Sequence, residues 1–215
     1  MRLFLLVLAL LPIACAGPGT TRSGFLESYD DLQASPKGGD GEVWAASPDA
    51  LSGFDRILLE PVEFWTEPGA EGGLRAEDVG GLSKRFHDAF RSELTGSYPL
   101  VNQPGEGVLR VRAAVTRLVP TRPVLNTLTQ APPVRMASMG AKLLTGTHLG
   151  IGHVAIEAEF SDSLTGEVLA RFVDVHVGSK LEVLDGMTKW NQVEDGFENW
   201  AAGLREHLDE HSATK

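Results

Sequence analysis

Two runs of alternating apolar and polar side chains constrain the fold of this chain more than any other feature. They lie in residues 153–179, HVAIEAEFSDSLTGEVLARFVDVHVGS, and are separated by the turn sequence DSLTGE. Strict alternation is typical of a β-strand that buries one face, and a Gly-containing turn between two such strands predicts an antiparallel hairpin. One face of this hairpin must therefore be covered by another part of the chain.

The other segments with clear periodicity are two further strands and two helices, and the helices can cover this face. Residues 108–119 alternate in the same way, and residues 55–65 hold a continuous apolar run that is typical of a buried strand. Apolar residues recur at helical spacing over about 77–96 and 188–211. With a short strand at 98–101, this order predicts an α+β fold: a mostly antiparallel sheet of about five strands with two amphipathic helices packed on one face.

The N-terminus predicts export and lipidation. An apolar run covers residues 3–13 after Arg2, which is shorter than the roughly 20 residues that span a bilayer. A positive start, a short apolar core and small residues at its end describe a signal peptide. Ala14 and Cys15 resemble the lipobox of bacterial lipoproteins, although Pro12 stands where leucine is usual. The resemblance implies a diacylglycerol and an N-acyl chain on Cys15; a cleaved signal with an incidental cysteine is the alternative.

The domain boundaries follow from this interpretation. We expect a signal peptide at 1–14, a lipidated cysteine and tether at 15–22, and a single domain at 23–215. Cys15 is the only cysteine, so the mature domain has no disulfide and its stability must come from its core. Ala16 stands where aspartate is typical of lipoproteins of the inner membrane, so the resemblance points to the outer membrane, with the domain facing the periplasm.

The net charge limits the partners. The chain carries 19 Lys and Arg against 29 Asp and Glu, a formal charge of −10, and loss of Arg2 with the signal peptide changes this to −11. Such an acidic chain is repelled by nucleic acids and by anionic headgroups. We therefore expect no nucleic-acid partner and a membrane association that depends on the acyl chains. Since no cofactor-binding motif occurs in a usable context, we also expect no cofactor apart from the covalent lipid.

A long segment at about 119–151 interrupts the predicted strands. It contains four prolines and leads into MASMGAKLLTGTHLGIG, in which Lys142 is the only charged residue. Long insertions between strands are usually functional or disordered. The low polarity of the segment makes it the best candidate for a surface that contacts an envelope protein or a second copy of the chain. The residues predicted to form it are Met136, Met139, Leu143, Leu144 and Leu149.

A second candidate site depends on the register of the hairpin. If the turn places Asp162 opposite Glu167, then His153 lies opposite His176. One face then gathers two imidazoles and two carboxylates, from His153, His176, Asp174 and Glu157. Such a set could bind a divalent metal. A solvated sheet face has the same pattern, and a shift of one residue would separate the groups.

Two short motifs resemble known sites. The residues HLDEH, 207–211, match the H-x-x-E-H pattern of inverted zinc proteases. No downstream carboxylate supplies a third ligand and the chain ends four residues later, so a solvated helix end is favoured. The residues GIGHVA, 150–155, resemble a dinucleotide-binding turn but lead into a strand instead of a helix, which excludes that function.

The N-terminal part of the domain, residues 23–53, is largely irregular. Phe25, Leu26, Tyr29 and Leu32 are spaced for a short helical turn that docks on the domain.

Several stretches together resemble a family of uncharacterised bacterial lipoproteins, domain of unknown function 3313. They are SGFLESYDDL, EVWA, RILLEPVEFW, YPLVNQPGEGVLRVRAAVT and IEAEFSDSLTGEVLA, which cover most of residues 23–175 in order. The resemblance implies an envelope lipoprotein and supplies no activity, cofactor or catalytic residue.

These observations favour a non-enzymatic outer-membrane lipoprotein that takes part in envelope interaction or assembly. The alternative is a periplasmic module that binds a metal or small ligand at the face of His153 and His176. An enzyme ranks third, because the sequence offers no convincing nucleophile–base pair or acid–base carboxylate pair.

Overall fold

The computed structural model describes residues 20–36, 38–65, 76–119, 153–177 and 190–212. The strands in this part of the chain are β1 (Gln33–Ala34), β2 (Glu42–Ala45), β3 (Arg56–Leu59), β4 (Glu63–Phe64), β5 (Val108–Val119), β6 (His153–Asp162) and β7 (Val168–Val177). The helices are α1 (Ala76–Leu94) and α4 (Asn191–Ser212). Neither of these two helices combines the length and the apolar character needed to cross a membrane.

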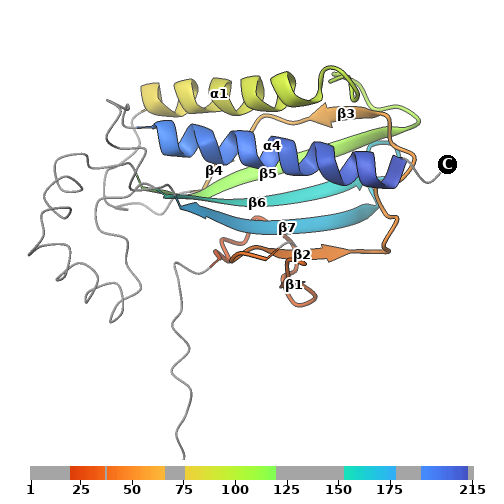
Figure 1. The fold of residues 1–215 in the computed structure, drawn as a ribbon, viewed down its shortest axis with the longest axis horizontal. Coiled ribbons are helices and arrows are strands. Elements are labelled where there is room, and N and C mark those ends of the chain that lie inside the picture. Colours follow the sequence, from red (N-terminus) through yellow and green to blue (C-terminus); the bar gives the residue numbers. More distant parts are fainter. Residues whose placement is uncertain (1–19, 37, 66–75, 120–152, 178–189, 213–215) are drawn as a thin grey trace, which may run out of the picture.

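The seven strands form one mixed sheet (Figure 1). Their order is β1-β2-β7-β6-β5-β3, and β4 also pairs with β5. Strands β3 and β4 run parallel to β5, whereas the other neighbours are antiparallel. Since α1 lies between β4 and β5 in the chain, it provides the crossover that a parallel pairing requires.

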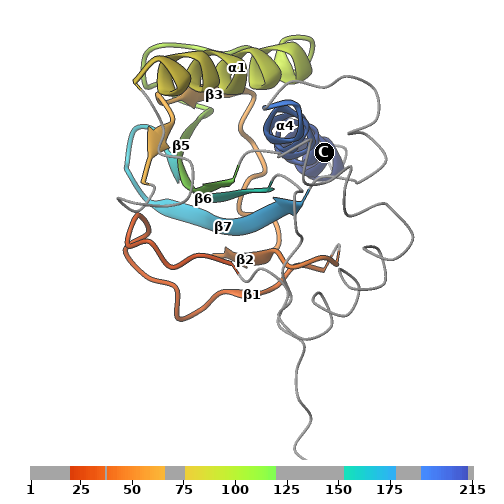
Figure 2. The same ribbon diagram turned by 90° about the vertical axis from the view of Figure 1, so that its left-hand side faces the viewer.

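The predicted α+β class, with two helices on one face of the sheet, is confirmed (Figures 1 and 2). The sheet differs from the expected one because it is mixed and has seven strands instead of about five. Two of the additional strands, β1 and β2, extend the edge farthest from α1 (Figure 2). The predicted strand at 98–101 is reduced to a single bridge between Leu100 and Ile57.

The main core lies between the helices and the sheet. The apolar stripe of α4 is buried along its length, at Val193, Phe197, Trp200, Ala201, Leu204 and Leu208. From α1, Phe86 meets Phe197 edge to face, with ring centroids 5.2 Å apart. This face of the sheet supplies alternate residues of β5 and β6, including Val111, Ile156 and Ala158.

The opposite face of the sheet is covered by the N-terminal segment, residues 20–32. Phe25 and Leu26 are buried there against Ala114 and Val173, and they form a second, smaller core. The predicted docking of this segment is therefore confirmed, although it docks through bends and a turn instead of a helical turn. The central strands are covered on both faces as a result.

Candidate functional site

The register of the hairpin separates the residues of the predicted metal site. The turn forms as expected, since the amide of Asp162 donates to the carbonyl of Glu167 at 3.0 Å. A bulge follows, because Phe160 pairs with Ala170 whereas Ser161 pairs with Val168, which leaves Leu169 as an extra residue on β7.

The extra residue shifts the rest of the ladder by one position. His153 pairs with Val177, and Val154 pairs with His176. Because successive side chains of a strand point to opposite faces, His153 and His176 lie on different sides of the sheet. The prediction that they face each other is wrong, and the register shift is the reason.

The two carboxylates of the predicted set are separated in the same way. Asp174 lies on the helix face, where it accepts a hydrogen bond from the indole Nε1 of Trp200 at 2.7 Å. Glu157 lies on the opposite face, beneath the N-terminal segment. The four residues therefore do not form one metal site.

Glu157 serves a structural purpose instead. Its side chain is 0 % exposed, and its carboxylate accepts hydrogen bonds from three residues of the N-terminal segment. The donors are the hydroxyls of Thr21 (3.0 Å), Ser23 (2.9 Å) and Tyr29 (2.5 Å) and the amide of Ser23 (2.8 Å). A buried carboxylate with this many donors is well satisfied without a cation. Burial, and then the bond to Glu157, raise the pKa of the Tyr29 phenol.

Charged residues close the rest of this face. Glu159 is largely buried between two arginines, 3.3 Å from Nη1 of Arg112 and 3.7 Å from Nε of Arg171. The guanidinium of Arg112 lies over the ring of Phe25, and that of Arg171 lies over Trp44. These contacts cover the sheet, so the face acts as a docking surface for the chain's own N-terminal segment.

The helix face contains a cavity of about 380 Å³ between the sheet and α4. The strand residues at its floor form two rows across four strands, Val43-Phe172-Ala158-Ala113 and Ala45-Ala170-Phe160-Val111. Helix α4 contributes Asn199, Trp200, Gly203, Leu204 and His207. The remaining walls include Phe90 of α1, Leu51, and the loop between β1 and β2, through Ser35, Pro36, Gly38 and Gly41.

Small side chains create this cavity. Ala113 of β5 and Ala158 of β6 are paired in the sheet and line the cavity together with α4. Ala170 lies in the adjacent row. On the helix side, a Cβ atom added at Gly203 would meet nothing within 4 Å. Larger residues at these positions would fill the space with their own side chains, as in an ordinary close-packed core.

A few polar groups lie among the apolar walls. Asp174 is partly exposed, and its Oδ2 is occupied by the Trp200 indole. Its Oδ1 points toward Gly41, since a Cβ atom at Gly41 would lie 2.9 Å from it. Asn199 and His207 also border the cavity. An apolar enclosure with a small number of polar groups is the usual design of a small-molecule site. The sequence contained no periodic signal for it, because it depends on the pairing of alanines from separate strands.

The other predicted site residues lie outside the described part of the chain. They are Cys15 and the residues of the proposed contact surface, Met136, Met139, Leu143, Leu144 and Leu149. The predictions made for them remain predictions.

Comparison with known families gives a match over residues 21–204 to the model described as protein of unknown function DUF3313. No curated protein matches the chain.

Among solved structures, a PelC dodecamer from Paraburkholderia phytofirmans has 12% sequence identity, covers 77% of this chain and 97% of its own, and gives a TM-score of 0.42. A variant of the same protein has 13% identity, coverages of 78% and 96%, and a TM-score of 0.43. A putative neuraminyllactose-binding hemagglutinin homologue from Helicobacter pylori has 10% identity, coverages of 82% and 89%, and a TM-score of 0.34. Such low scores support no argument about this chain's function.

Proposed function

This chain belongs to the DUF3313 family of proteins of unknown function, and we propose that it is a non-enzymatic binding protein that holds a small, mainly apolar molecule between its sheet and α4. The observation that carries the proposal is the cavity of about 380 Å³. Its size lies within the range of ligand sites, roughly 300–1,000 Å³, and apolar side chains dominate its walls.

The polar groups indicate which apolar molecules would fit. Among the described residues no hydrogen bond is made to Oδ1 of Asp174, so this oxygen can accept a hydrogen bond from a hydroxyl or an ammonium group of a ligand. A carboxylate ligand would be repelled by Asp174 and by the net charge of −10. The proposed ligand is therefore an apolar chain or ring that carries a hydroxyl or amino group.

Ligand binding can be tested with 1-decanol as the probe and decanoate as its matched anion. The Trp200 side chain borders the cavity, so its fluorescence should report the occupied state. We expect saturable binding of 1-decanol and at least tenfold weaker binding of decanoate. Asp174→Asn should reduce that difference, because the amide keeps a hydrogen-bond acceptor and loses the charge.

Filling the cavity provides the decisive comparison. Gly203→Leu should place a side chain in the open space above the alanines and abolish decanol binding. Gly81→Leu is the matched control, because Gly81 is also helical with open space around it but lies exposed on α1, away from the cavity. Equal decanol binding by wild type and Gly203→Leu, with both chains folded, would refute the proposal.

The cellular setting belongs to the same proposal. We place the protein at the periplasmic face of the outer membrane, held by lipid on Cys15, on the basis of the apolar run, Ala14 and Ala16. Palmitate labelling that is lost in Cys15→Ser would support this, and labelling that survives the substitution would contradict it.

A role in envelope interaction or assembly is the second candidate, and the composition of residues 136–152 favours it, since Lys142 is their only charge. In-cell crosslinking of the lipoprotein followed by mass spectrometry tests it. A reproducible partner or homo-oligomer that disappears on replacing Met136, Met139 and Leu143 with alanine would support an interaction role. A monomer without partners would leave the cavity as the functional site.

A further inference from the structure

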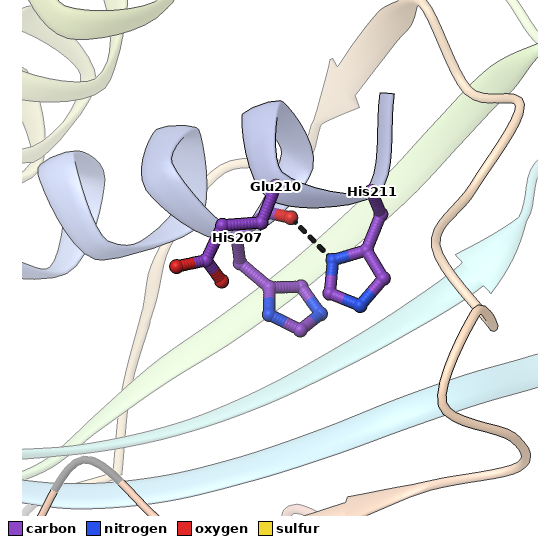
Figure 3. Close-up of side chains that lie close together, drawn as sticks. All are labelled: His207, Glu210 and His211. Atoms are coloured by element: carbon purple, nitrogen blue, oxygen red, sulfur yellow. Dashed lines mark hydrogen bonds between the residues drawn. The ribbon is translucent and has the colours of Figure 1, made fainter. Parts of the chain in front are cut away.

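The end of α4 brings together three side chains that can bind a metal ion. His207, Glu210 and His211 are separated by three and four positions, so they share one face of the helix (Figure 3). The ligand atoms of the two imidazoles and the carboxylate all lie within 4.8 Å of one another. The ring centroids of the two histidines are 4.3 Å apart.

One of the two imidazoles is held in a form that is ready to coordinate. Nδ1 of His211 lies 2.7 Å from the carbonyl oxygen of His207 (Figure 3). A carbonyl oxygen can only accept, so Nδ1 carries a proton, and in the neutral imidazole Nε2 then keeps its lone pair. Metal-binding histidines commonly donate their second ring nitrogen in this way, which fixes the tautomer and the orientation of the ring.

The C-terminal end of α4 is ordered and packed against the domain. Helix α4 continues through Ser212, and Leu208 is only 1 % exposed. The hydroxyl of Tyr98 donates to Asp209 at 3.0 Å, and Arg205 binds Glu93 of α1 at 2.6 Å. The backbone that carries the two histidines is therefore anchored to the rest of the domain on its other side.

We propose that His207, Glu210 and His211 bind one Zn²⁺ ion, with water as the fourth ligand. Two histidines and one carboxylate are a common protein ligand set for zinc with an open position. Tetrahedral zinc with bonds of 2.0–2.1 Å needs ligand atoms about 3.3 Å apart. The ligand atoms here lie within 4.8 Å of one another, and rotation of the exposed Glu210 side chain can bring its carboxylate closer to the two imidazoles. This site is additional to the cavity, although His207 belongs to the wall of both.

The test is a zinc titration of the purified full chain, without a histidine tag, by calorimetry and by the visible absorption of bound Co²⁺. We expect one ion per chain, micromolar or tighter affinity, and the intense absorption of tetrahedral Co²⁺ that Zn²⁺ displaces. His207→Gln and His211→Gln should each weaken binding at least tenfold, and Glu210→Gln should weaken it by less.

Matched histidine substitutions elsewhere provide the control. His87→Gln on α1 and His153→Gln on β6 should leave the zinc affinity unchanged, because neither residue lies in the cluster. Circular dichroism would confirm that each variant remains helical. Unchanged affinity and stoichiometry in the His207→Gln/His211→Gln double variant would overturn the proposal, as would millimolar binding only. Since no apolar ligand is present, the result is independent of the cavity.

Discussion

At the scale of single residues, Glu157 determines how the N-terminal segment is held. Its carboxylate is buried at the centre of the sheet, between Ala114 on β5 and Val173 on β7. Within the part of the chain that the structure describes, the hydrogen-bond donors to this carboxylate come from residues 21–29. A charged acceptor strengthens each of these bonds relative to a neutral one. The segment is therefore fixed by one side chain that belongs to a distant strand.

Removing this acceptor should be costly. Glu157→Ala leaves the partly buried donors of Thr21, Ser23 and Tyr29 without this partner, and an unsatisfied polar group costs about 1–3 kcal/mol when it is buried. We expect the free energy of unfolding in urea to fall by at least about 2 kcal/mol, and less for Glu157→Gln. Exposed Glu167→Ala is the control and should change little. An unfolding free energy equal to that of wild type would contradict the role given to Glu157.

The pH dependence of this contact follows from Tyr29. Burial and the bond to Glu157 raise the phenol pKa above its ordinary value of 10.0 in the folded state. Stability from a raised pKa is fully present below the unfolded pKa and is lost as the pH rises through the folded pKa. The difference in unfolding free energy between wild type and Tyr29→Phe should thus be constant up to about pH 9 and shrink above pH 10. A constant difference at all pH values would disagree with this account.

At the scale of elements, the approach of α4 to the sheet depends on Gly196. A Cβ atom at this position would lie 2.8 Å from Cγ1 of Val154 and 3.2 Å from Cβ of His176. Both contacts are shorter than van der Waals separation, so the helix would have to move away from β6 and β7.

Two glycines of the same helix provide a matched comparison. Gly196→Ala should lower the free energy of unfolding by about 1–3 kcal/mol through overpacking, in spite of the better helix propensity of alanine. Gly203→Ala should raise it by up to about 1 kcal/mol, because a Cβ atom there meets nothing within 4 Å. Urea unfolding of the two variants would measure both. Equal effects of the two substitutions would show that propensity, and not packing, controls this helix.

The same elements show how far the sequence could predict the fold. Alternation identified β5, β6 and β7, and helical spacing identified α1 and α4, because these long elements repeat their pattern several times. Strands of two to four residues, such as β1 and β2, are too short to show a period. The failure of the predicted metal site has a related reason. One extra residue, Leu169, shifts β7 by one position against β6, so that His176 lies on the face opposite to that of His153, and no pattern in the sequence marks this bulge.

At the scale of the whole molecule, the two faces of the sheet are covered by different parts of the chain. The N-terminal segment covers one face, and the helices, the cavity and the histidine cluster lie on the other side. Only five residue steps separate Cys15 from Thr20, the first described residue, a reach of at most about 18 Å. If Cys15 carries the lipid, Thr20, at the start of the N-terminal segment, stays within this distance of the bilayer surface. We therefore expect the face covered by this segment to lie toward the membrane and the helices to face away from it, where a ligand or a metal ion can reach them.

This orientation can be measured because Cys15 is the only cysteine of the chain. If Cys15 carries the proposed lipid, Glu27→Cys and Lys84→Cys each introduce one accessible thiol, the first on the N-terminal segment and the second on α1. A fluorophore at each position would be quenched by quencher-labelled lipid headgroups according to its distance from the bilayer. We expect strong quenching at position 27 and weak quenching at position 84, because the short tether holds the first close and the thickness of the domain separates the second. Equal quenching would mean that the domain rotates freely about its anchor. Stronger quenching at position 84 would place the helices, and with them the cavity, against the membrane.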